Sequence, residues 1–242
     1  MTAPRRTARL EHRLTRPTAT LAELDAAIGL ALGHELASLL VSPWLVRAAS
    51  RRLGRSSVRV ATVIGFPHGG QVAAVKAFEA SKALQDGATQ LDFVLNAGAL
   101  LSGDEKAVLD DMLAVVEMAH SAVAVAGLIV QAGALDEELI RRACRLAARA
   151  GVDSVVTSCG DDPAPATAQR AGLLRRVVGD ELEVTAAGEL ADVADVAAAV
   201  GAGADRISTS FSPELAAAAT AWLREPAPAA QPSLADLGAA VG

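Results

Sequence analysis

The sequence of 242 residues contains no tyrosine, and aromatic residues make up only 2% of it. A core stabilised by aromatic clusters is therefore excluded. Alanine, valine and leucine supply most of the 52% hydrophobic residues, which favours closely packed layers of strands and helices. No apolar run approaches the roughly 20 residues of a membrane-spanning helix. No apolar segment follows the basic residues 1–7 as a signal peptide would require, so we expect a cytoplasmic protein.

Sulfur and metal ligands are also scarce. The two cysteines, Cys144 and Cys159, do not make a disulfide framework. The four histidines are dispersed and no H-x-x-x-H or C-x-x-C pair occurs, so we expect neither a metal site nor a cofactor. A net charge of −6 and scattered arginines argue against nucleic acid as a partner. We expect a small-molecule substrate.

Lysine is the scarcest charged residue, at only three of the 22 basic positions. This bias towards arginine, together with the abundant alanine, indicates a GC-rich genome. Lys76, Lys82 and Lys106 all fall within predicted helices that cover the outside of the fold, among polar neighbours. We therefore expect all three amino groups to be solvated.

Short β-branched or aliphatic runs alternate with longer amphipathic stretches as far as residue 224. Eight such βα units imply a parallel sheet, which can close into a (β/α)8 TIM barrel. A doubly wound open sheet is the alternative, but no G-x-G-x-x-G follows the first strand. We expect one domain over residues 1–225 and a flexible Pro/Ala-rich tail over 226–242. The predicted strands are 9–14, 36–41, 58–64, 90–95, 125–130, 154–157, 183–186 and 206–209; the predicted helices are 21–33, 43–53, 71–86, 104–120, 136–150, 163–178, 191–201 and 213–224.

Several helix ends carry recognisable signals. Thr20 with Glu23 and Ser102 with Glu105 fit the capping box, in which side chains satisfy the first free N–H groups of a helix. Ser212 precedes a proline at the first helical position. Glycines stand where three helices should end, at positions 87, 151 and 203.

In such a barrel the carboxyl ends of the strands and the loops after them form the active site. Glycine and small hydroxyl residues dominate these loops, so their N–H groups can approach an anion closely. The loops in question are 65–70, 92–98, 131–133, 157–160, 185–189 and 208–212.

Five segments in chain order resemble the deoxyribose-phosphate aldolase family. They are EHRL (11–14), VATVIGFPHG (60–69), GATQLDFVLNAGAL (87–100), GVDSVVTSCG (151–160) and AGADRISTS (202–210). The resemblance runs from about residue 9 to about residue 224. It implies a (β/α)8 barrel of the class I aldolase type, usually a homo-oligomer, that cleaves deoxyribose 5-phosphate through a lysine Schiff base without metal.

The residues that do this chemistry differ. The resemblance aligns the family's imine-forming lysine with Val156, its second lysine with Thr185 and its third with Gly127. The family's glutamate aligns with Gln131, and only the aspartate of the fourth strand is kept, as Asp92. An imine needs a primary amine, so the resemblance predicts loss of the Schiff-base route.

The phosphate site implied by the family is altered as well. Gly188, Ser208, Thr209 and Ser210 keep the backbone that would hold phosphate, but Glu189 replaces the second glycine of the family's turn. Two further carboxylates, at 161–162, follow Gly160. A carboxylate within roughly 5 Å of a phosphate dianion repels it.

Asp92 is the main candidate for catalysis, either as a general acid or base or as a structural acceptor that holds a loop. Asn96 follows on the same face and is a candidate orienting partner. Further catalytic candidates are Cys159 as a nucleophile, and Thr157, Ser158, Thr185 and Gln131 as hydrogen-bond donors to a carbonyl or hydroxyl group. Candidate substrate-binding residues are Asn96, Gly188, Glu189, Ser208, Thr209 and Ser210.

Two functions remain open from the sequence. The first is an imine-independent lyase, isomerase or cyclase that uses acid–base chemistry at Asp92 on a carbonyl or hydroxyl compound. The second is a non-catalytic relative, which binds a ligand or pairs with an active homologue. In either case we expect a homodimer or such a partnership, since the family is usually oligomeric.

Overall fold

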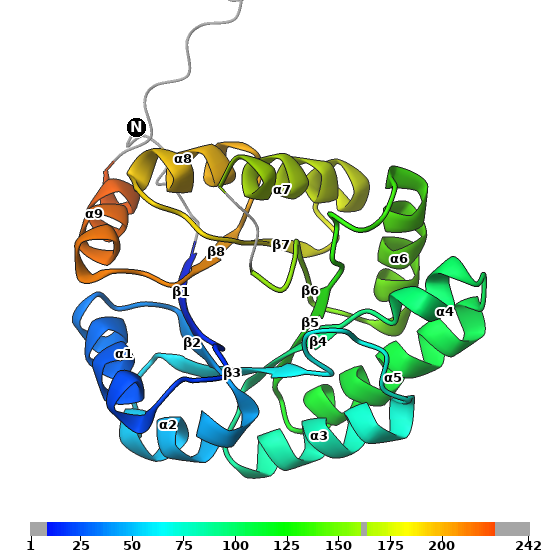
Figure 1. Ribbon diagram of the computed structural model, residues 1–242, viewed down its shortest axis with the longest axis horizontal. Helices are drawn as coiled ribbons and strands as arrows, with labels where there is room; N and C mark the ends of the chain where they lie inside the picture. The colour runs from blue at the N-terminus through cyan, green and yellow to red at the C-terminus, as the bar shows by residue number, and fades with distance from the viewer. Residues whose placement is uncertain (1–8, 161–163, 226–242) are drawn as a thin grey trace, which may run out of the picture.

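The computed structural model describes residues 9–160 and 164–225. Eight parallel strands, each paired with the next in chain order, form one closed barrel. Helices surround the ring of strands (Figure 1). The predicted (β/α)8 barrel is confirmed and the open-sheet alternative is wrong. The predicted tail 226–242 and the acidic pair 161–162 lie outside the described residues. The strands are β1 (Arg9–Leu14), β2 (Ser38–Val41), β3 (Arg59–Ile64), β4 (Gln90–Val94), β5 (Val125–Ile129), β6 (Ser154–Val156), β7 (Glu183–Ala187) and β8 (Arg206–Thr209).

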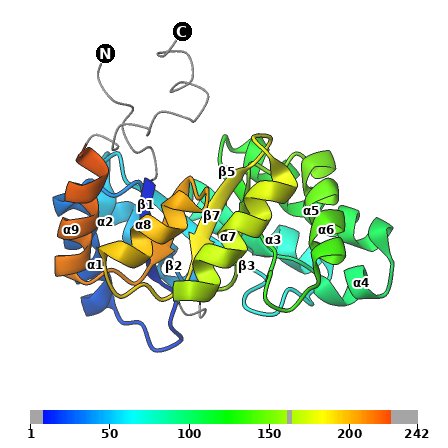
Figure 2. The ribbon, with the colours of Figure 1, turned by 90° about the horizontal axis from the view of Figure 1, so that it is seen from above.

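The helices follow the predicted order with one addition. The unpredicted helix α4 (Ala97–Leu101) begins directly after the loop that leaves β4. Seen from a second direction, α4, α5 and α6 lie together at one end of the molecule and α1 and α9 at the other (Figure 2). No helix in the described part of the chain is long and apolar enough to cross a membrane. The other helices are α1 (Leu21–Gly33), the 3-10 helix η1 (Pro43–Leu45), α2 (Val46–Leu53), α3 (Ala73–Gln85), α5 (Glu105–Ser121), α6 (Glu137–Ala150), α7 (Ala164–Val178), α8 (Val193–Gly201) and α9 (Pro213–Arg224).

Two separate hydrophobic clusters make up the core. The larger lies between the strands and the surrounding helices. The smaller lies inside the barrel, because side chains alternate along each strand and hydrogen bonds between β1, β4 and β8 show which set points inward. We call this smaller cluster the apolar layer; it consists of Leu40, Ala61, Val63, Val94, Ile129, Val156 and Ala187.

The helix-end signals are confirmed with one exception. Thr20 and Glu23 form both hydrogen bonds of a capping box at α1, and Ser212 caps α9. The predicted box of Ser102 with Glu105 is wrong, because Asp104 caps α5 through its bond with the N–H of Ala107. Ser102 instead ends α4, whose existence the sequence did not indicate.

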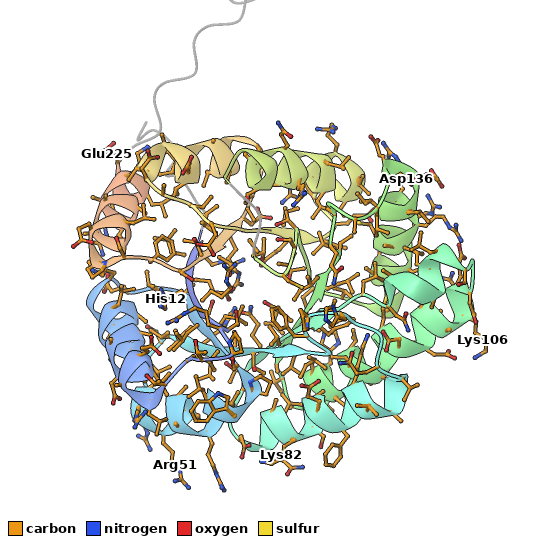
Figure 3. The ribbon with its side chains drawn as sticks, in the orientation of Figure 1. His12, Arg51, Lys82, Lys106, Asp136 and Glu225 are labelled. Atoms are coloured by element: carbon orange, nitrogen blue, oxygen red, sulfur yellow. The ribbon has the colours of Figure 1, made fainter. Side chains whose placement is uncertain are left out.

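The prediction that all three lysines are solvated is wrong for Lys76. Lys82 and Lys106 project from the outer rim of the molecule (Figure 3). Lys76 is fully buried between the barrel and α5, where its amino group donates to the carbonyl of Val94 at 2.8 Å and to Asp111 at 2.5 Å. The spacing of Lys76 along α3 is typical of a surface residue. Its side chain is buried because α5 packs against α3 at this place.

Candidate functional site at the barrel mouth

A network of five polar side chains crosses the barrel interior beneath the apolar layer. Gln90 is its centre: its amide nitrogen donates to Glu11 at 3.0 Å and to Asp92 at 3.2 Å. Its amide oxygen accepts from Arg206 at 2.8 Å. Ser38 donates to Glu11 at 2.6 Å and accepts from Arg206 at 3.0 Å. Four strands are thus joined across the barrel by side chains that water hardly reaches.

Asp92 is the group with acid–base potential in this network. It is 2% exposed. Burial and then the nearby charge of Glu11 raise the pKa of Asp92 to about 7, against the opposing influence of Arg206 and Gln90. A carboxyl group with this pKa exists in both protonation states near neutral pH, as a general acid or base requires. The same burial also fits a structural acceptor.

The apolar layer separates Asp92 from the loops at the strand ends. Val94 and Ile129 lie two residues beyond Asp92 and Gly127 on their strands, and Val156 completes the layer on β6. Phe66 and Cys159 pack against the layer from the loop side. The floor of the barrel mouth is therefore hydrocarbon.

Gly127, where the resemblance leads us to expect the family's third lysine, leaves no room for a side chain. A Cβ atom built on it would lie 2.4 Å from Oδ1 of Asp92 and 2.9 Å from the hydroxyl of Ser154. The Asp92 carboxylate thus lies directly against the backbone where a side chain would begin. Restoring a lysine there would require Asp92 to move.

Thr157 and Ser158 both use their hydroxyl groups within the fold. Each donates to the carbonyl of Ala187 at 3.1 Å, and each accepts from a backbone N–H, of Ala187 and Gly160 respectively. These bonds fasten the loop after β6 to the end of β7. Thr185 is buried beside Val156 and Arg206, its register partners on β6 and β8.

Gln131 and Cys159 are brought together at the rim of the mouth. Both donate to the carbonyl of Pro67, the Gln131 amide at 2.7 Å and the Cys159 thiol at 3.3 Å. The Gln131 amide nitrogen is 3.8 Å from the Cys159 sulfur. The loops after β3, β5 and β6 therefore meet here, and Gln131 holds a left-handed backbone with φ of 54°.

Arg13 lies at the mouth although the sequence did not single it out. It points inward, like Glu11 two residues earlier, and its side chain is 6% exposed. Its Nη2 atom donates to the carbonyl of Gly160 and to the carboxylate of Glu189, both at 2.6 Å. Glu189 is thus neutralised by a buried cation and is not a free carboxylate.

Several groups in the loops implied for phosphate are engaged in internal bonds. The N–H of Gly188 donates to the carbonyl of Ser208 at 3.1 Å, and that of Leu190 to the hydroxyl of Thr209 at 3.3 Å. The hydroxyl of Ser210 donates to the carbonyl of Arg13 at 3.2 Å. These contacts hold the ends of β7, β8 and β1 together.

Asn96 and His12 have local roles in the fold. The Asn96 side chain accepts from the N–H of Ala99 and caps α4, so it is not positioned as a partner of Asp92. His12 faces outward from β1 (Figure 3), and its Nδ1 atom accepts from the N–H of Phe211. Burial lowers the pKa of His12 to about 4, so the ring is neutral near pH 7.

Sequence reasoning missed Glu11, Arg13, Gln90 and Arg206. All four are charged or polar at alternate positions of predicted strands, on the face shared with Asp92. That alternation was the available signal. Residues at the ends of strands and in the loops after them are the usual catalytic positions of such barrels, whereas these four lie within the strands.

These features together define the class of the protein: a (β/α)8 barrel whose ionisable residues gather inside the barrel and whose polar loops surround its carboxyl-terminal mouth. The model of the DeoC/LacD family aldolases matches residues 7–212, and the chain belongs to this family.

Two relatives illustrate the similarity in sequence. The chain is 40% identical over 201 residues to a deoxyribose-phosphate aldolase of Streptococcus equi subsp. zooepidemicus, a match that covers 83% of this chain and 90% of the relative. It is 40% identical over 203 residues to the enzyme of that name from Thermococcus gammatolerans, with 83% and 90% covered.

Solved structures agree with the sequence relatives. An aldolase named QR15 superposes with a TM-score of 0.79 at 30% identity, covering 88% of this chain and 94% of that one. The deoxyribose phosphate aldolase of Aeropyrum pernix, described as a unique tetramer, gives 0.76 at 29% identity, with 89% of each chain covered.

Proposed function

We propose that this chain is an aldolase-family barrel that performs an imine-independent lyase, isomerase or cyclase step. Asp92 would move the proton, and the substrate would be a carbonyl or hydroxyl compound other than deoxyribose phosphate. The observation that carries the proposal is the inward-facing Asp92 carboxyl with a pKa of about 7 in a barrel interior without a lysine.

The positions of all three lysines support a reaction that proceeds without an imine. Lys82 and Lys106 are exposed on helices, each paired with an aspartate one turn away. Lys76 is held outside the barrel by Asp111. Val156, at the position of the family's imine-forming lysine, belongs to the apolar layer. None of these side chains supplies a primary amine to a carbonyl carbon at the mouth.

The apolar layer sets a condition on this function. A substrate reaches Asp92 only if side chains of the apolar layer move apart, because this layer lies between the carboxyl group and the loops. The same layer favours the second candidate, a non-catalytic family member that binds a ligand at its mouth or acts beside an active homologue.

Exchange of carbon-bound hydrogen for deuterium separates the two candidates. Acetaldehyde, propanal, dihydroxyacetone and glyceraldehyde are incubated with the protein in deuterium oxide, and the α-hydrogens are followed by proton NMR. The proposal predicts exchange of at least one compound, lost in Asp92→Asn while the fold is retained. Exchange that persists in Asp92→Asn contradicts the role of Asp92. Absence of exchange across the panel favours the non-catalytic candidate.

The absence of an imine is tested by reduction with borohydride in the presence of acetaldehyde. The expected mass of the intact protein is unchanged, whereas a relative with a reactive lysine gains the mass of a reduced two-carbon adduct. A single stable adduct on Lys76 would overturn the proposal and restore amine chemistry.

A further inference from the structure

We infer that Arg13 is the binding group for a ligand carboxylate at the barrel mouth, and that the ligand is a short aliphatic carboxylic acid. The inference rests on the proposed function in placing the ligand at the same mouth, and it adds the ligand's chemical class.

Arg13 is a cation built into the end of the barrel. Its register partner on β2 is Leu40, a member of the apolar layer, so its side chain rises from the edge of that layer. The guanidinium reaches the loops after β6 and β7, where it contacts Gly160 and Glu189. The positive charge of Arg13 therefore lies next to the apolar layer.

The guanidinium group has unused hydrogen-bonding capacity. Nη2 makes the two bonds to Gly160 and Glu189, whereas Nη1 is buried and has no acceptor among the described residues. A buried charged donor without a partner is unfavourable, because it has lost its hydrogen bonds to water without replacing them. A carboxylate can accept from two nitrogens of one guanidinium at once, and so would satisfy Nη1.

The present counter-ion can be displaced. Glu189 belongs to the loop after β7, and 61% of its side chain is exposed, so it regains water readily when it leaves Arg13. Arg13 itself is 6% exposed and stays charged. An incoming anion therefore exchanges with a solvated carboxylate, not with a buried one.

The surroundings favour a carboxylate over a phosphate. The backbone N–H groups of Gly188 and Leu190 already donate within the fold and are not available to an anion. A phosphate dianion carries two negative charges, of which one guanidinium balances only one. The apolar layer beneath, with Phe66 packed on it, suits a short hydrocarbon chain.

Gly160 is matched to Arg13. A Cβ atom built on Gly160 would lie 1.5 Å from Nη1 of Arg13, so any other residue would push the guanidinium away. The glycine also has φ of 102°, a conformation that other residues rarely adopt. The loop after β6 thus accommodates the guanidinium at this place.

Calorimetric titration with three probes tests the inference: butanoate, its neutral analogue butanamide, and inorganic phosphate. We expect butanoate to bind at least tenfold more tightly than butanamide or phosphate. Arg13→Gln should abolish that preference. Glu189→Gln should tighten butanoate binding severalfold, because the competing charge is removed, and it remains informative if Arg13→Gln fails to fold.

Three outcomes would overturn the inference: equal binding of butanoate and butanamide, preference for phosphate, or butanoate binding that Glu189→Gln leaves unchanged. Asp92→Asn separates this inference from the proposed function. That variant should bind butanoate as the parent does, whether or not the parent exchanges α-hydrogens.

Discussion

At the scale of single residues, Asp92 combines two demands that pull in opposite directions. Its burial beside Glu11 raises its pKa to about 7 and so supplies an acid–base group. The same burial makes the ionised form costly to keep in the folded protein. Whether Asp92 is catalytic or structural, its raised pKa therefore makes the free energy of unfolding depend on pH.

Asp92→Asn should gain stability relative to the parent as the pH rises. The folded-state pKa of Asp92 lies above its usual 3.8, so between about pH 4 and pH 7 the folded parent holds a proton that the unfolded chain has released. Its stability then falls by up to roughly 1.4 kcal/mol per pH unit across this window, and the variant lacks this loss. Urea unfolding at pH 5 and pH 8 measures the difference.

His12 acts in the opposite sense and must be separated from Asp92. Its folded-state pKa of about 4 means that the parent loses stability as the pH falls from about 6.5 towards 4. Because both proteins contain His12, its contribution cancels in the comparison. An equal gap between parent and variant at the two pH values would refute the prediction for Asp92.

The buried ion pair of Lys76 and Asp111 can also be tested through its effect on the free energy of unfolding. Burial lowers the pKa of Lys76 and raises that of Asp111, and the ion pair between them opposes both changes. Lys76→Met should cost about 3–5 kcal/mol because it leaves a buried carboxylate alone, and Lys76→Met with Asp111→Leu should recover most of this loss.

Lys106→Met provides the matched control, because Lys106 pairs with Asp110 on an exposed face. Its cost should stay below about 1 kcal/mol. Denaturant unfolding of the four proteins gives the comparison. A similar small cost at Lys76 would mean that the amino group is solvated, as the helix pattern alone had suggested.

At the scale of secondary-structure elements, the ends of helices were predicted less well than their existence. The capping box at α1 follows from local sequence, since Thr20 and Glu23, three residues apart, supply both of its hydrogen bonds. At α5 the preceding short helix α4 takes up Ser102, so Asp104 becomes the cap. The capping box predicted over residues 102–105 is therefore wrong because Ser102 belongs to the end of the neighbouring helix α4.

The turn between α5 and β5 contains a residue in an unfavourable conformation. Val123 has φ of 57° and is 94% exposed, and a β-branched residue is strained in this left-handed region. Val123→Gly should stabilise the protein by about 1 kcal/mol, as an increase in melting temperature. Val75→Gly on α3, where φ is helical, should destabilise it by a similar amount. Destabilisation by both changes would contradict the strain at Val123.

At the scale of the whole molecule, the barrel was predictable because eight βα repeats leave few other arrangements. The arrangement inside it was not. Arg206 and Glu11 lie 195 positions apart in sequence and meet only because the barrel closes between β8 and β1. Strand alternation could have placed both on the inner face, but their partners depend on register, which no local pattern supplies.

The last prediction concerns self-association through exposed apolar side chains on α3. Val72, Val75 and Phe78 form a stripe along α3, and they are 67%, 51% and 74% exposed. Contiguous exposed apolar side chains of this kind often mark a contact between proteins. We propose that this stripe is the interface of a homodimer. Phe78→Glu should then convert the dimer to a monomer in light scattering after size exclusion.

Leu32→Glu is the control for this last prediction, because Leu32 is 45% exposed on α1, on another side of the ring (Figure 1). It should leave the dimer intact, since a charge there meets only water. A parent that stays monomeric up to high protein concentration would exclude the homodimer. Association would then require a different chain. An active homologue that co-elutes with the parent but not with Phe78→Glu would identify the same stripe as its contact.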